Sequence, residues 1–204
     1  MDSLAPSNSV SAVILAGGQA RRMQQQDKGL VSFLGAPLIS YPITALVSIT
    51  GTILISANRN HERYQQWGYP VLSDQFGHFD GPLAGILTAL HTVNTDILLV
   101  MPCDTPLVTP ADLQRLLQAL NDSKMTVAAA HDGLRLQPVF LAMRTPLAEN
   151  LQTFLQGGQR KMQLWLQQQA LVCVDFSDRA HIFTNVNSFA ELAELEAAAG
   201  SDRA

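Results

Sequence analysis

Short apolar and β-branched runs recur along the chain, and polar or turn-forming residues bound each of them. Runs of this length and composition are typical of buried strands. The first run leads directly into Ala16-Gly17-Gly18, where glycine favours a tight loop after the strand. The predicted strands span residues 10–15, 52–57, 96–101, 125–130, 137–143 and 171–176.

Helical periodicity occupies several of the intervals between these runs. The clearest helix is predicted to start at Thr109, because an N-cap threonine is followed by Pro110 at the first helical position and by Asp112 at the positive end of the helix dipole. Its apolar residues recur at i, i+3, i+4 and i+7, as Leu113, Leu116, Leu117 and Leu120. Further helices are predicted from Pro82, burying Leu83, Ile86, Leu87 and Leu90; from Thr145-Pro146, burying Leu147, Leu151, Phe154 and Leu155; and from Ser188-x-x-Glu191, which fits a capping box.

Strands that alternate with helices predict an α/β fold with one doubly wound, mostly parallel sheet. Such sheets bind ligands at the carboxyl ends of their strands. With 204 residues, no internal repeat and no linker, the chain has the length of a single compact domain. We expect this domain to span residues 10–199, between a disordered N-terminal tail of residues 1–9 and a C-terminal tail of residues 200–204.

Composition narrows the classes of function. Hydrophobic residues make up 47% of the chain and charged residues 15%, which predicts an ordinary globular protein. The formal net charge of −4 argues against a broad basic face for nucleic acid. The apolar runs are far shorter than the roughly 20 residues that span a bilayer, and residues 1–8 lack the pattern of a secretory signal. We therefore expect a cytoplasmic protein with no membrane or nucleic-acid partner, in which Cys103 and Cys173 are reduced thiols without metal-ligand spacing.

The most informative segment follows the first predicted strand directly. It reads L-A-G-G-Q-A-R-R-M and continues through Gln24-Gln25-Gln26 to Asp27-Lys28. Its two glycines let backbone N–H groups approach an anion, and Arg21, Arg22 and Lys28 place three of the 13 basic residues within eight positions. The segment matches neither the P-loop nor the dinucleotide-binding pattern. It indicates a different phosphate loop that a triphosphate would fit, the alternative being a surface loop with incidental charges.

A candidate metal ligand follows the strand predicted at residues 96–101. The motif Pro102-Cys103-Asp104 places the Asp104 carboxylate at the carboxyl end of that strand, facing the same crevice as the glycine-rich loop. Mg²⁺ takes one or two protein carboxylates and completes its shell with water and substrate phosphates, so a cluster of carboxylates is not required. The alternative is an Asp104 that forms a turn or caps a helix.

The chain resembles the nucleotidyltransferase family and, within it, the molybdenum cofactor guanylyltransferases. The resemblance rests first on the family signature L-A-G-G-x-[AS]-x-R-[ML] followed by a lysine. The chain departs from the family at Gln24-Gln25-Gln26, where glycines are common, and this predicts altered loop closure rather than loss of activity. Further motifs in the family's order extend across most of residues 10–197, and they are Asn58-Arg59, Asp74, Gly81-Pro82-Leu83-Ala84-Gly85, Pro102-Cys103-Asp104-Thr105-Pro106 and Asn185-Val186-Asn187.

The resemblance also implies roles for individual residues. Catalysis is assigned to Lys28, Asp104 and Arg21, and metal binding to Asp104. Recognition of guanine or ribose is assigned to Asn58 and Asp74, which would otherwise count as turn residues. Substrate binding as a whole is assigned to Leu15, Ala16, Gly17, Gly18, Lys28, Asn58, Asp74, Gly81, Gly85, Asp104, Asn185 and Asn187.

Two segments keep structural alternatives. Asn185 and Asn187 are expected to line the pterin side or the metal side of the cleft, and helix capping by Asn187 is the alternative. The basic, glycine-rich residues 157–161 are assigned to the phosphate of the second substrate, and a helix C-cap followed by surface charges is the alternative.

The implied reaction uses Mg²⁺ and transfers GMP from GTP to the terminal phosphate of molybdenum-molybdopterin. No serine elbow or histidine triad is evident, and none is needed, because a phosphate ionised near pH 7 attacks the α-phosphorus directly. Transient contacts with cofactor-biosynthesis proteins, client molybdoenzymes or their chaperones also follow from the resemblance. The alternatives are a molybdopterin cytidylyltransferase, a sugar-phosphate nucleotidyltransferase and a non-catalytic cofactor carrier. The cytidylyl enzymes tend toward L-A-A-G, so L-A-G-G favours guanine.

Overall fold

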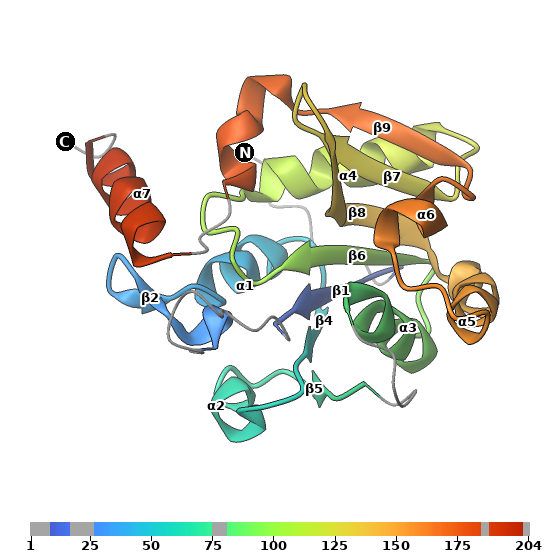
Figure 1. The fold of residues 1–204 in the computed structure, drawn as a ribbon, viewed down its shortest axis with the longest axis horizontal. Helices are drawn as coiled ribbons and strands as arrows, with labels where there is room; N and C mark the ends of the chain where they lie inside the picture. The colour runs from blue at the N-terminus through green and yellow to red at the C-terminus, as the bar shows by residue number, and fades with distance from the viewer. Residues whose placement is uncertain (1–8, 17–26, 75–80, 185–187, 202–204) are drawn as a thin grey trace.

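The computed structural model describes residues 9–16, 27–74, 81–184 and 188–201. Figure 1 shows its main sheet with helices packed on both faces. The seven strands of this sheet lie in the order β5-β4-β1-β6-β8-β7-β9. Their bounds are β1 (Val10–Leu15), β4 (Thr52–Ser56), β5 (Val71–Leu72), β6 (Ile97–Pro102), β7 (Val127–His131), β8 (Leu136–Arg144) and β9 (Leu171–Asp175).

Strand β8 runs antiparallel to both of its neighbours, β6 and β7, whereas the other strand pairs in this sheet are parallel. The predicted α/β fold with a mostly parallel, doubly wound sheet is therefore confirmed. The register between β7 and β8 shifts from Ala129 opposite Leu141 to Ala130 opposite Gln137, so residues 138–140 bulge out of the ladder. Pro138 lies in this bulge. Because the bulge is outside the hydrogen-bonded ladder, the missing N–H group of proline costs no hydrogen bond there.

The two faces of the sheet form two apolar layers, because the central strands carry hydrophobic residues at consecutive positions, as buried parallel strands require. In β1, for example, Val13 packs on one layer while Ala12 and Ile14 pack on the other. Helices α3 (Pro82–Thr92), α5 (Ala148–Gln156) and α6 (Met162–Leu166) cover the first layer. The second is covered by α1 (Ser40–Leu46), α2 (His61–Gln65), α4 (Pro110–Asp122) and the 3₁₀ segment η3 (Ser177–Phe183). Among the described residues, no helix has the length and apolar character needed to cross a membrane.

A smaller apolar cluster lies beside the main sheet. The two-stranded hairpin of β2 (Ser32–Phe33) and β3 (Ala36–Pro37) packs there against α7 (Phe189–Ser201), at the left of Figure 1. The Leu34 N–H also donates a hydrogen bond to Glu196 Oε1 over 2.7 Å. Helix α7 continues to Ser201, past the domain boundary predicted at residue 199. Residues 1–8 and 202–204, which make up most of the two predicted tails, lie outside the described residues.

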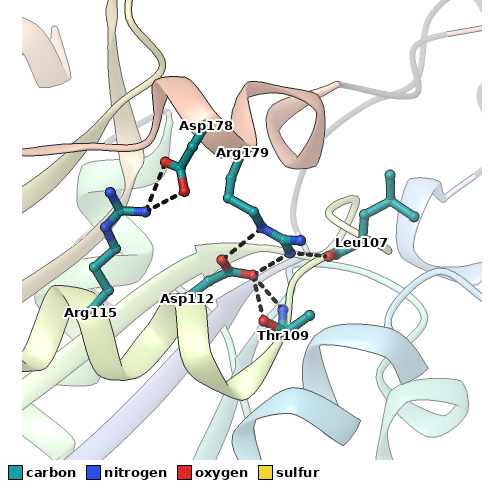
Figure 2. Close-up of polar contacts among 6 residues, drawn as sticks. All are labelled: Leu107, Thr109, Asp112, Arg115, Asp178 and Arg179. Atoms are coloured by element: carbon teal, nitrogen blue, oxygen red, sulfur yellow. Dashed lines mark hydrogen bonds and ion pairs between the residues drawn. The ribbon is translucent and has the colours of Figure 1, made fainter.

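Segment η3 is attached to α4 by a polar network that Figure 2 shows in detail. Asp112 is buried and accepts hydrogen bonds from Arg179 Nε over 3.1 Å, from Arg179 Nη2 over 2.9 Å and from the Thr109 N–H over 2.8 Å. Arg115 Nη1 donates to Asp178 Oδ1 over 2.9 Å, and its guanidinium carbon lies 4.6 Å from the ring centroid of Phe176. The N-cap predicted at Thr109 is confirmed, and the Asp112 carboxylate that completes its capping box also pairs with the half-buried Arg179.

The six predicted strands are all present, with bounds that differ by at most two residues. The helix predicted from Thr145 begins as a 3₁₀ turn, η2 (Thr145–Leu147), before α5 follows. The sequence pattern did not predict α1, α2, α6, β5 or the hairpin of β2 and β3. Each of these elements has seven residues or fewer. A hydrophobic period cannot be read over so short a segment.

Candidate functional site

A cavity of about 280 Å³ opens at the carboxyl ends of β1, β4 and β6. A doubly wound sheet places its ligand site at this edge, because the parallel strands end there together and their loops diverge. Leu15, Ser56 and Pro102 are the last residues of the three strands, and all three line the cavity. The described lining residues are Leu15, Lys28, Ser56, Asn58, Asp74, Gly81, Pro82, Gly85, Pro102, Cys103, Asp104 and Val139.

Most of the described residues that the sequence nominated meet at this cavity. They are Leu15, Lys28, Asn58, Asp74, Gly81, Gly85 and Asp104. Ala16 does not line the cavity; it is fully buried, and its N–H donates to the Ser56 carbonyl over 2.8 Å. Gly17, Gly18, Arg21, Asn185 and Asn187 lie outside the described residues, so their positions stay predictions. The roles of the whole set likewise remain predictions, since a shared cavity shows only that they can act together.

Lys28 and Asp104 both line the cavity and form an ion pair between Nζ and Oδ2. Lys28 opens the 3₁₀ turn η1 (Lys28–Leu30), and Asp104 follows β6 by two residues. The Cys103 N–H donates to the Leu15 carbonyl over 3.1 Å, which continues the pairing of β1 with β6 and holds Asp104 beside the start of the glycine-rich segment. Both side chains of the pair are largely buried, with exposed fractions of 15% for Lys28 and 7% for Asp104. Water therefore screens their attraction only weakly.

Cys103 also lines the cavity, but its thiol is suited to packing rather than to nucleophilic attack. Burial raises the pKa of the Cys103 thiol well above its ordinary value of 9.0, and the Asp104 carboxylate raises it further. The nucleophilic form of cysteine is the thiolate. A thiol that stays protonated at neutral pH agrees with a reaction that needs no covalent intermediate.

Asn58 and Asp74 interlock at the ends of two neighbouring strands. The Asn58 Nδ2 group donates to Asp74 Oδ2 over 2.8 Å, and the Asp74 N–H donates to Asn58 Oδ1 over 3.0 Å. The two bonds run in opposite directions, so each residue orients the other. Asn58 is exposed and Asp74 half-buried, which leaves the pair accessible from the cavity. The arrangement presents a carboxylate, which can only accept hydrogen bonds when ionised.

The amino end of α3 forms another part of the cavity lining. Gly81 is its N-cap, with φ of 106°, a left-handed conformation that favours glycine, and Pro82 follows at the first helical position. The first turn of an α-helix carries N–H groups without intrahelical partners, and these can bind an anion. Gly85 brings α3 close to β4, because a Cβ atom there would lie 2.3 Å from Ser56 Oγ.

The glycine-rich residues 157–161 behave as the structural alternative predicts. Gly157 caps α5, and Gly158 follows with φ of 82° and donates its N–H to the Leu155 carbonyl over 3.1 Å. Arg160 Nη1 donates to the same carbonyl over 2.7 Å. These contacts close the carboxyl end of a helix, and the segment does not line the cavity described above.

Sequence reasoning missed some of the residues at this site. Ser56, Pro102 and Val139 line the cavity although the sequence assigned them no role there, and Val139 lies within the β8 bulge. Asp27 was noted only as the neighbour of Lys28, yet its carboxylate is buried and accepts hydrogen bonds from Asn60 and Tyr64. Its place inside the signature segment was the one available signal, since a short polar residue in a loop otherwise predicts exposure.

A divalent cation would find one buried carboxylate here. Within the described parts of the chain, no group of three or more His, Cys, Asp or Glu side chains gathers as a closed metal site. Asp104 supplies one carboxylate, which is enough for Mg²⁺ when substrate phosphates and water supply the other ligands. Its Oδ2 already holds the Lys28 ammonium group, so the position accommodates a cation. The residues present are therefore compatible with Mg²⁺ bound together with a phosphorylated substrate.

Comparison with known proteins gives a consistent result. The family model described as "MobA-like NTP transferase domain" matches residues 12–173. The molybdenum cofactor guanylyltransferase of Shewanella loihica is 47% identical over 180 residues, which are 88% of this chain and 91% of that protein. The enzyme of the same name from Shewanella frigidimarina is 46% identical over the same shares.

Solved structures agree in fold. Molybdopterin-guanine dinucleotide biosynthesis protein A from Archaeoglobus fulgidus superposes with a TM-score of 0.78 at 19% identity, over 94% of this chain and 99% of that one. CMP:2-keto-3-deoxy-manno-octonic acid synthetase, solved in complex with CTP, superposes with a TM-score of 0.72 at 17% identity, over 96% of this chain and 100% of that one. At these identities the structural likeness establishes the fold alone.

Proposed function

Since this chain belongs to the MobA-like NTP transferase family, and within it to the molybdenum cofactor guanylyltransferases, we propose that it transfers GMP from GTP to the terminal phosphate of molybdenum-molybdopterin. The products are the guanine dinucleotide form of the cofactor and pyrophosphate. The observation that carries the proposal is one cavity, at the ligand-binding edge of the sheet, that combines the Lys28–Asp104 pair, the Asn58–Asp74 pair and the amino end of α3.

The phosphate chemistry falls to Lys28, Asp104 and the amino end of α3. The Lys28 ammonium group lies in a weakly screened position, where a positive charge stabilises the charge that develops on the α-phosphate and on the leaving pyrophosphate. Mg²⁺ bound at Asp104 would neutralise phosphate charge and orient the phosphate oxygens. The Asp104 carboxylate is held in place because Asp104 lies only two residues beyond the end of β6. The attacking oxygen belongs to the second substrate, so the protein aligns the reactants and supplies no nucleophile.

Selection of the base falls to the Asn58–Asp74 pair. Guanine presents the donors N1–H and N2–H₂ on one edge, and a carboxylate is an acceptor that suits them. Adenine offers an acceptor at N1 instead, which would leave the acceptor of the protein facing another acceptor. A buried polar group left unpaired costs roughly 1 to 3 kcal/mol. GTP should therefore be preferred over ATP by at least about tenfold.

A second cavity of about 290 Å³ offers room for the acceptor substrate. Pro102 and Val139 line both cavities, so the two adjoin at the β8 bulge. Gln137 lines the second cavity, and its Nε2 group donates to Asp132 Oδ2 over 2.6 Å. The Gln137 carbonyl oxygen is then the end of the side chain that can accept a donor from a bound heterocycle. We assign the pterin to this cavity and the amides predicted at Asn185 and Asn187 to the same substrate.

A donor panel tests the proposal. Purified protein and Mg²⁺ are incubated with GTP, ATP or CTP and with either molybdenum-molybdopterin or a sugar phosphate as acceptor. Pyrophosphate, the dinucleotide product and binding of the pterin are quantified. GTP should give the highest kcat/KM. CTP as the best donor would replace the assignment with a cytidylyltransferase, and activity only with a sugar phosphate as acceptor would replace it with a sugar-phosphate enzyme. Binding of the pterin without release of pyrophosphate from any donor would identify a carrier.

A further inference from the structure

Asp27 is a buried carboxylate that the reaction outlined above leaves without a role. It directly precedes Lys28, and its carbonyl accepts the Leu30 N–H over 3.0 Å, which starts the turn that carries Lys28. Only 2% of its side chain is exposed. Burial of a carboxylate costs free energy unless hydrogen bonds and charges compensate it. The location of its partners therefore shows what the carboxylate stabilises.

Among the described residues, the partners of the Asp27 carboxylate all come from the segment between β4 and the end of α2. Asn60 Nδ2 donates to Asp27 Oδ2 over 2.9 Å, the Tyr64 hydroxyl donates to Oδ1, and Arg59 Nε lies 3.6 Å from Oδ2. This segment includes Asn58, which lines the nucleotide cavity. The Asp27 side chain thus connects the turn that carries Lys28 to the turn that carries Asn58.

Close packing holds the distance between these two turns nearly constant. Tyr64 is fully buried, and a Cβ atom on Gly29 would lie 2.6 Å from its hydroxyl, so the backbone at residue 29 packs directly on that group. Burial, and then the nearby Cys103 and Asp27, raise the pKa of Tyr64 above its ordinary value of 10.0, so the hydroxyl keeps the proton that it donates. Asn60 has φ of 54°, a conformation that asparagine tolerates and that the bond to Asp27 helps to hold.

We propose that Asp27 is a positioning residue that fixes the base-reading pair Asn58–Asp74 relative to the phosphate-binding pair Lys28–Asp104. The proposal rests on the nucleotide site proposed above. Asp27 acts through Asn60, Arg59 and Tyr64, and it does not line the cavity among the described residues. Its loss should misplace the base relative to the phosphates, so binding and base selectivity should fall together.

The test compares two buried aspartates. Asp27→Asn keeps the shape of the side chain but removes its charge and one acceptor oxygen. Asp112→Asn is the matched control, because Asp112 is also buried and also binds an arginine, Arg179, but in the network between α4 and η3 shown in Figure 2, away from the nucleotide cavity. Calorimetry measures the Kd values of GTP and ATP with Mg²⁺, and thermal unfolding measures stability. Tyr64→Phe adds a mild variant that keeps the Asp27 carboxylate and the packing of the ring.

Both aspartate variants should lower the melting temperature, but only Asp27→Asn should raise the Kd of GTP, by about tenfold, and lower the preference for GTP over ATP. Tyr64→Phe should shift the same two quantities in the same direction by a smaller factor. If Asp27→Asn loses stability as Asp112→Asn does while both Kd values stay at the wild-type level, Asp27 is only structural and the proposal is overturned.

If Asp27→Asn does not fold, Tyr64→Phe provides the test instead. Kd values of GTP and ATP that are unchanged in that variant overturn the proposal. A wild-type protein that prefers another nucleotide would overturn the proposed donor instead. The same comparison made with that nucleotide would still decide the role of Asp27.

Discussion

Gly85→Ala tests the geometry of the nucleotide cavity directly. The added Cβ atom would lie 2.3 Å from Ser56 Oγ, 3.2 Å from Ser56 Cβ and 3.1 Å from Leu15 Cδ2. Non-bonded atoms prefer separations of about 3.5 Å or more, so α3 must move away from β4 by about 1 Å. Removal of the Ser56 hydroxyl would relieve only the shortest of the three contacts. The contacts with Ser56 Cβ and Leu15 Cδ2 remain tight, so the amino end of α3 is displaced as well.

The expected cost follows from this displacement. Overpacking of a filled core costs typically about 1 to 3 kcal/mol, and a loss of about 2 kcal/mol lowers the melting temperature of a chain of this length by roughly 4 to 8 °C. A misplacement of about 1 Å in a positioned active site costs about a hundredfold in rate. Gly85→Ala should therefore lower both the melting temperature and kcat/KM for GTP.

Two further variants make this prediction sharp. Gly51→Ala is the matched control, because a Cβ atom at Gly51 meets no atom within 4 Å and its φ is not left-handed, so both quantities should stay near the wild-type values. Gly85→Ala combined with Ser56→Ala removes the hydroxyl that causes the worst contact and should recover part of the loss. Thermal unfolding and steady-state kinetics on the four proteins suffice. The explanation fails if Gly85→Ala has the same melting temperature and kcat/KM as Gly51→Ala. It also fails if adding Ser56→Ala to Gly85→Ala recovers neither quantity.

Asp104→Ala should abolish turnover without changing the circular dichroism spectrum, and normal activity across a Mg²⁺ titration would remove Asp104 from the metal site. Lys28→Ala should lower kcat by about a hundredfold or more, and a rise in KM alone would mean that Lys28 binds the ground state and the transition state equally. Iodoacetamide at pH 8 should alkylate the exposed Cys173 and spare the buried Cys103, so mass spectrometry of the folded protein should show a single adduct. Folding also raises the pKa values of Cys103 and Tyr64. The unfolded chain therefore loses these protons first, so these two groups should leave stability unchanged between neutral pH and about pH 9 and lower it as the pH rises further. A melting temperature that stays flat from pH 9 to pH 10.5 would contradict this.

Local sequence was sufficient to predict the main strands and helices of the fold. The strand at residues 10–15 and the helix from Thr109 are encoded by neighbours a few positions apart, through burial of consecutive apolar residues in one case and capping with helical spacing in the other. Asp104 was placed at the ligand edge because it follows a predicted strand. A helix-sized period or a strand end is a property of contiguous residues, so no tertiary contact was needed to recognise it.

Contacts between distant segments decided the rest. The reversal of β8 and its bulge depend on pairing with β6 and β7, and no feature inside residues 136–144 encodes either partner. Asp27 reads as an ordinary loop aspartate until the fold brings it against Asn60 and Tyr64, 33 and 37 positions away. By itself the sequence determined the fold class, the ligand edge and the side chains able to act there. Only the tertiary structure decided which of them share a cavity and which buried groups lie next to them, because burial and pairing depend on the final distance between atoms rather than on their order along the chain.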